Sequence, residues 1–211
     1  AWILGGIVIG GGLLVGYRWW DAHTTQQAQT AAGEFSRLQA AISEGNTGEA
    51  EQLTATLRKE FGETPYVDHA ELSLARQHVE KGELDQAAER LRLVADKSDD
   101  QYLRQVARLR LARVELAQNK ADAALATLNQ VEKGKAGGGA FSALLNEVRG
   151  DALLAKGDRS GALDAYRAAF LESQGAGGEG SQLQMKINEL TTLADTAPTA
   201  PATDAPEDAA K

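Results

Sequence analysis

Residues 81–91, KGELDQAAERL, contain the pattern on which the fold prediction depends, because related stretches recur at regular intervals. The others are EGNTGEAEQL from Glu44, QNKADAALATL from Gln118 and KGDRSGALDAY from Lys156. The turn residues of the four stretches are spaced 37, 37 and 38 residues apart; they are Gly45, Gly82, Asn119 and Gly157. A repeat of this period indicates a solenoid of stacked units rather than a closed domain.

Each turn residue separates two stretches rich in alanine, leucine and arginine. Gly and Asn adopt the left-handed conformation that ends a helix, and an alanine follows each turn residue by five positions: Ala50, Ala87, Ala124 and Ala162. That alanine lets two helices pack closely, with Leu91, Leu128 and Tyr166 filling the space four residues later. The first repeat departs here, with Thr54. We therefore predict an all-α fold, an α-solenoid of about four helix hairpins.

The segment after the fourth repeat differs from the repeats. A glycine-rich stretch at 175–180 precedes SQLQMKINELTTL, in which Leu183, Ile187 and Leu190 share one helical face. This segment is the expected C-terminal capping helix of the solenoid. Residues 195–211 form a tail of Ala, Pro, Thr and Asp that we expect to be disordered.

The N-terminal stretch, residues 1–17, is AWILGGIVIGGGLLVGY and carries no charge; Arg18, Trp19 and Trp20 follow it. Aromatic residues beside an arginine are typical of a membrane interface, so we predict a transmembrane anchor over 1–20 and a polar stalk over 21–30. A cleavable signal peptide is the main alternative. The chain starts inside the apolar run, so we expect further residues upstream. Small residues including Gly5, Gly12 and Gly16 form a stripe that either packs against another membrane helix or is simple filler.

Composition excludes several classes of function. The 211 residues include no cysteine and carry a net charge of −8, which argues against thiol chemistry and against nucleic acid as a partner. We expect no catalytic site, metal or cofactor, because no known catalytic motif occurs and His69 and His78 lack a second ligand at i+3 or i+4. His78 is expected to pack between helices.

A concave groove lined by the first helix of each hairpin remains as the candidate binding surface. The repeat register places equivalent residues of three hairpins in rows: Leu72, Arg76 and Val79; Leu109, Arg113 and Leu116; Glu147, Asp151 and Leu154. Peptide segments could lie on the apolar positions, with the arginines binding carboxylates or carbonyls. Alternatively, the arginines only pair with neighbouring surface acids.

The hairpins resemble the tetratricopeptide repeat. Ala75, Ala112 and Gly150 occupy its close-contact position, twelve residues before the second-helix alanine. The signature tryptophan is absent, and the loops are longer than in the usual 34-residue unit. The order of span, stalk, hairpins and capping helix, with the stretches at 109–114, 149–158 and 184–190, resembles the YfgM-like family of ancillary SecYEG translocon subunits.

That resemblance implies a single-pass protein of the bacterial inner membrane. The N-terminus would be cytoplasmic and the repeat domain, 31–194, periplasmic. It also implies three partners: the SecYEG translocon, a membrane-anchored periplasmic chaperone of prolyl-isomerase type, and the lipid bilayer. The favoured function is a non-enzymatic scaffold that passes translocated proteins to chaperones. The alternative is a holdase whose groove binds unfolded secretory or outer-membrane proteins directly.

Overall fold

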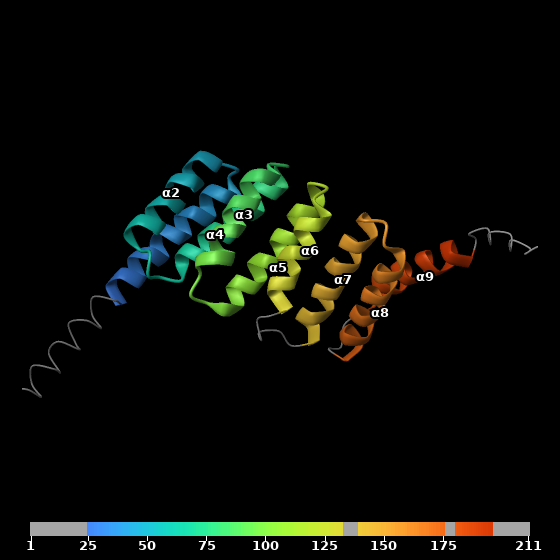
Figure 1. Ribbon diagram of the computed structural model, residues 1–211. Helices are drawn as coiled ribbons and strands as arrows, with labels where there is room; N and C mark the ends of the chain where they lie inside the picture. The colour runs from blue at the N-terminus through green and yellow to red at the C-terminus, as the bar shows by residue number, and fades with distance from the viewer. Residues whose placement is uncertain (1–24, 133–138, 176–179, 196–211) are drawn as a thin grey trace, which may run out of the picture. The chain divides into compact units, whose positions relative to one another are not determined.

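A computed structural model describes residues 25–132, 139–175 and 180–195 (Figure 1). Every regular element in these ranges is an α-helix, which confirms the all-α class. Residues 25–43 are helical, and the later helices are α2 Thr47–Glu60, α3 Tyr66–Glu80, α4 Leu84–Lys97, α5 Gln101–Ala117, α6 Ala121–Glu132, α7 Gly139–Ala155, α8 Arg159–Gly175 and α9 Ser181–Asp195. The chain divides into two compact units, unit 1 (Ala1–Ala136) and unit 2 (Gly137–Lys211).

The four predicted turn residues all have the left-handed backbone conformation. Their φ angles are 76° at Gly45, 76° at Gly82, 60° at Asn119 and 84° at Gly157, and Asn119 is the only non-glycine residue with positive φ in the described part of the chain. At each turn the following amide donates to a carbonyl five residues back, as from Glu83 to His78 at 2.8 Å. This hydrogen bond satisfies a carbonyl at the helix end, and its repetition confirms the predicted hairpin turns.

The second-helix alanines are the contact points of the hairpins, as predicted. All four, Ala50, Ala87, Ala124 and Ala162, are wholly buried. Leu91, Leu128 and Tyr166 are buried beside them, and Thr54 takes the same place in the first hairpin. The Thr54 hydroxyl donates to the Ala50 carbonyl at 2.8 Å, so the polar group is satisfied without leaving the core.

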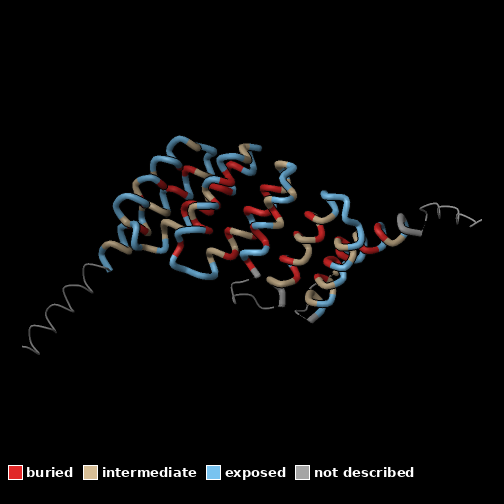
Figure 2. Tube along the Cα trace, in the orientation of Figure 1, coloured by how far each residue is buried: buried red, intermediate tan, exposed pale blue. Residues whose placement is uncertain are grey.

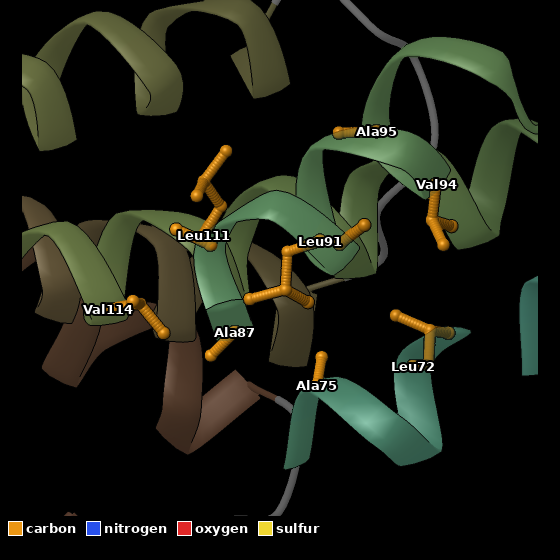
Figure 3. Packing of buried hydrophobic residues seen from close by; sticks show 10 residues of the cluster. Leu72, Ala75, Ala87, Leu91, Val94, Ala95, Leu111 and Val114 are labelled. Carbon is orange, nitrogen blue, oxygen red and sulfur yellow. The ribbon is translucent and has the colours of Figure 1, made fainter. Parts of the chain in front are cut away.

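Helix α3 contributes to two apolar clusters of unit 1. Ala70 and Leu74 pack with the helix over 25–43 and with α2. Leu72 and Ala75, on another face of α3, belong to a second cluster. It also contains Ala87 and Leu91 of α4 and Leu111 of α5 (Figure 3). Because α3 is buried on both faces, the buried residues form a continuous row through this unit (Figure 2), as expected of stacked repeats.

Unit 2 consists of one hairpin, α7 and α8, with α9 packed beside it. Leu183, Ile187 and Leu190 of α9 are buried against Ala162, Tyr166 and Ala169 of α8. The predicted apolar face of the C-terminal helix is therefore confirmed. Burying three large aliphatic side chains contributes on the order of 5 kcal/mol before entropy is counted.

Several predicted features lie outside the described residues. They are the anchor over 1–20 with Gly5, Gly12 and Gly16, part of the glycine-rich stretch at 175–180, and the tail after Asp195. Within the described ranges no helix is both long and apolar enough to cross a membrane. Residues 25–30, assigned to the stalk from sequence, are helical and continue into the first hairpin.

Candidate partner-binding groove

Unit 1 contains an open hollow of about 340 Å³ between α3, α4 and α5, which we call the arginine groove. Its lining residues are Leu72, Ala75, Arg76, Val79, Leu84, Leu91, Arg110, Arg113, Val114 and Ala117. Apolar side chains make up most of this surface, and arginine is the only charged residue type in it. A mainly apolar hollow with a few charged groups is the usual form of a binding site.

Helix geometry explains how α3 contributes to the arginine groove. Leu72, Arg76 and Val79 follow one another at spacings of four and three residues, so they share one face of the helix. Ala75 lies between them and brings α4 close. Leu72 is buried in the floor, whereas Val79 is 43% exposed at the end of the row. The groove therefore offers an apolar surface that no described residue of unit 1 covers.

The three arginines differ in their partners. Arg76 Nε donates to Glu80 Oε1 at 2.8 Å, an i,i+4 pair in which both side chains are largely exposed. Such surface pairs contribute only about 0.3–0.5 kcal/mol and break easily. Arg110 and Arg113 are exposed and form no ion pair with any described residue. Two guanidinium groups are thus available to an incoming ligand.

The α5 side of the groove differs from the predicted row. Arg113 lines the groove together with Arg110, Val114 and Ala117, whereas Leu109 and Leu116 do not line it. Leu109 is 5% exposed and buried elsewhere. Sequence reasoning missed Arg110, which could have been found from its spacing, since it lies three residues before Arg113 on the same side of α5.

The third predicted row belongs to unit 2, where α9 engages it. Lys186 Nζ lies 2.9 Å from Glu147 Oε1 and 2.7 Å from Asp151 Oδ1. The Tyr166 hydroxyl donates to the same Asp151 oxygen at 2.7 Å, and Lys186 lies 5.1 Å from the centre of the Tyr166 ring. Leu154, the last residue of the row, is partly exposed. Glu147 and Asp151 of α7 therefore bind α9 through Lys186.

This arrangement shifts the pKa values of Lys186 and Tyr166. Burial opposes the charged form of Lys186, but its hydrogen bonds to Asp151 and Glu147 outweigh that effect and raise its pKa. Burial, reinforced by the hydrogen bond to Asp151 and the nearby negative charges, also raises the pKa of Tyr166. Lys186 therefore stays charged and Tyr166 stays neutral throughout the physiological range.

No other cluster in the described chain suggests catalysis. The described residues include no group of His, Asp and Glu able to hold a metal. His78 is buried, as predicted, with Nδ1 2.7 Å from Glu83 Oε2. A second hollow of about 490 Å³ adjoins the buried Glu71, whose carboxylate is already held by Arg58 and Arg90. These groups have structural partners, which leaves the arginine groove as the candidate site.

Comparison with known proteins shows the family of the chain. The tetratricopeptide repeat-like domain family matches residues 1–192, nearly the whole chain. A protein of Escherichia coli (strain K12) named "Ancillary SecYEG translocon subunit" is 35% identical over 189 residues, covering 88% of this chain and 86% of that protein. The chain belongs to the YfgM-like family.

Two further proteins of the same name extend the similarity. The Haemophilus influenzae protein is 27% identical and covers 89% of this chain and 88% of its own length. The Aggregatibacter actinomycetemcomitans protein is 30% identical, with coverages of 87% and 86%. No solved structure matches the chain. As a YfgM-like protein, the chain combines tetratricopeptide-like hairpins with an arginine groove in its first unit.

Proposed function

We propose that this chain is an ancillary subunit of the SecYEG translocon, acting as a membrane-anchored scaffold that brings a periplasmic chaperone to the site where polypeptides emerge. The names of three relatives that align over most of their length support the translocon association. The apolar stretch over 1–17 supports the membrane anchor. The repeat domain then lies in the periplasm, with the N-terminus in the cytoplasm.

The single observation that carries the scaffold role is the arginine groove. Its apolar floor and its two guanidinium groups that form no ion pair with a described residue suit the capture of a protein segment. Helical repeats generally bind other proteins along such surfaces. We infer that a membrane-anchored chaperone of prolyl-isomerase type binds here, while the span, through Gly5, Gly12 and Gly16, packs against a translocon helix.

The test is cross-linking in native membranes. A photoreactive residue at position 113 reports on the arginine groove, and one at Val8 reports on the span. A matched probe at Glu89, an exposed residue of α4 outside the groove, is the control. The scaffold role predicts a chaperone captured from 113, a translocon subunit captured from Val8, and neither from 89. Capture of lipid alone from Val8, with no protein from 113, would contradict it.

A holdase that binds unfolded clients is the second candidate. The exposed Val79 and the apolar floor favour it, because unfolded segments present apolar side chains without a fixed charge pattern. The full chain in nanodiscs can be screened against arrays of secretory and outer-membrane protein peptides. Weak binding to many apolar peptides indicates a holdase, whereas one tight protein partner indicates a scaffold.

A further inference from the structure

We propose that the arginine groove recognises an acidic amphipathic segment of its partner protein. Apolar side chains of that segment pack against Leu72 and Val79, and its carboxylates bind between Arg76, Arg110 and Arg113. The inference rests on the proposed function, since it assumes that a partner binds at this groove. It adds the chemistry of the segment that is bound. Four observations lead to it.

The first observation is the local reversal of charge. The whole chain has 30 acidic and 22 basic residues, yet arginines are the only charged residues that line the groove. Arg76 has one acidic neighbour, Glu80, and Arg110 and Arg113 have no ion-pair partner among the described residues. A positive patch on an acidic protein attracts carboxylates and repels basic segments.

The second observation is the equivalent junction in unit 2. Asp151 occupies the position in α7 that Arg76 occupies in α3, since 75 residues, one 37-residue and one 38-residue period, separate them. In unit 2, α9 follows the hairpin of α7 and α8, and its Lys186 forms an ion pair with Asp151 at 2.7 Å. In unit 1, α5 follows the hairpin of α3 and α4. Its Arg110 and Arg113 line the same open hollow as Arg76.

Comparison of the two junctions indicates what unit 1 lacks. Where the charges are opposite, a direct ion pair closes the junction. Where the charges are alike, the guanidinium groups stay apart in solvent and the space between them remains open. A carboxylate placed between them would supply the missing opposite charge, and arginine binds carboxylates through two parallel hydrogen bonds.

The third observation concerns the apolar floor. Leu72, Leu84 and Leu91 form it, and Val79 remains 43% exposed at its end. An inorganic anion or a wholly acidic strand would leave this surface uncovered. An apolar side chain from the same segment would cover it, so the ligand is amphipathic rather than merely acidic.

The fourth observation is that no described segment of unit 1 itself fills the groove. Leu72, Arg76 and Val79 belong to α3, and the facing residues belong to α5, with no described acidic side chain inserted between the two helices. The chain's own tail, 196–211, carries Asp204, Glu207 and Asp208 but its other residues are Ala, Pro, Thr and one Lys. It therefore lacks the large apolar side chains that the floor would accept.

The test uses the full chain in nanodiscs and a fluorescent peptide of about four helical turns with Leu and Glu on one face. Three matched peptides replace Glu by Gln, Glu by Lys, or Leu by Ser. Fluorescence anisotropy gives Kd for the wild type, for the double variant Arg110→Gln/Arg113→Gln, and for Arg167→Gln, an exposed arginine of α8 that serves as the control. Thermal melting checks that each variant is folded.

We expect the double variant to weaken binding of the Leu/Glu peptide about 10-fold or more, because two charge-assisted contacts are lost. Arg167→Gln should change Kd by less than about 2-fold, the size expected for an exposed charge away from the interface. The Gln, Lys and Ser peptides should each bind at least about 10-fold more weakly than the parent. Salt should weaken the parent interaction, since its charges are partly exposed.

Three results would overturn the inference. Equal binding of the Gln peptide would indicate a holdase surface that reads only apolar character. Equal binding of the Ser peptide would indicate unspecific attraction of negative charge. Tighter binding after deletion of 196–211 would show that the tail is the occupant. If position 113 still cross-links to a chaperone in any of these cases, the proposed function stands and only the recognition chemistry is wrong.

Discussion

The ring of Tyr166 on α8 lies directly over Gly150 on α7. A Cβ atom at Gly150 would be 2.4 Å from Cε1 of that ring, which is closer than any side chain tolerates. Tyr166 is buried and its hydroxyl is held by Asp151 at 2.7 Å, so the ring has no free space into which to move. The large residue on one helix and the glycine on the other are therefore a matched pair.

The first prediction follows from this contact. Gly150→Ala should destabilise unit 2 by about 1–3 kcal/mol, because the added methyl group overpacks the hairpin. Hydrogen exchange in α8 is the direct measurement, with urea unfolding as support. Gly48→Ala is the control, since a Cβ there meets nothing within 4 Å and lies in helix α2; it should be neutral or slightly stabilising. Equal exchange rates in Gly150→Ala and wild type would contradict the prediction.

The second prediction concerns the hairpin turns. Gly82→Ala should cost about 1 kcal/mol although a Cβ there would touch nothing, because φ is 76° and an L-residue is strained in that region. Gly33→Ala, in the helix over 25–43 with equally open surroundings, is the matched control and should not destabilise the protein. Urea unfolding of both variants measures the difference. If both variants have the same stability, the turn conformation is not what selects glycine.

The third prediction is a pH dependence. Because the pKa of Lys186 in the folded chain is above its ordinary 10.5, its contribution is complete below that pH and is lost as pH rises through the folded value. Wild-type α9 should therefore lose hydrogen-exchange protection at high pH relative to Lys186→Met. At neutral pH Lys186→Met should be the less protected protein, since its Glu147 and Asp151 lack their cation, and this difference should shrink as pH rises. A constant difference between the two proteins at all pH values would rule this out.

The fourth prediction concerns the buried carboxylate of Glu71, which is 2% exposed. Arg58 Nε donates to it at 2.9 Å, and Arg90 Nη1 lies 3.6 Å from its second oxygen. Arg58→Met should cost about 2–3 kcal/mol, because it removes hydrogen bonds to a buried charge. The double variant Arg58→Met/Glu71→Leu should recover part of this loss, since no buried charge is then left. Urea unfolding of the two variants measures this difference, and a double variant no more stable than Arg58→Met would contradict the prediction.

The repeat pattern predicted most of the fold because its residues act locally. Gly82 and Asn119 end helices through their own backbone conformation, and Ala87 and Ala124 pack against the partner helix of the same hairpin. Neither effect needs information from distant parts of the chain. The turn positions and the buried alanines could therefore be found from spacing alone.

The candidate site was only partly predictable, because it depends on which faces of neighbouring helices meet. Leu72, Arg76, Val79 and Arg113 were placed by the repeat register, and all four line the arginine groove. The same register gave Leu109 and Leu116, which do not line it, and omitted Arg110. The contact between Lys186 and Asp151 could not be found from these rows, since the rows cover the hairpins alone and α9 follows the last of them.

The central claim is that the arginines of the groove in unit 1 bind the periplasmic partner of this chain. A photoreactive residue at Val79, inside the groove, tests it most directly in native membranes, with Tyr102, an exposed residue outside the groove, as the control position. The same experiment is repeated in the Arg110→Gln/Arg113→Gln background. Capture of one periplasmic protein from 79 and not from 102, with that capture lost in the double variant, is the expected result. Equal capture with and without the two arginines, or none from 79, would contradict the claim.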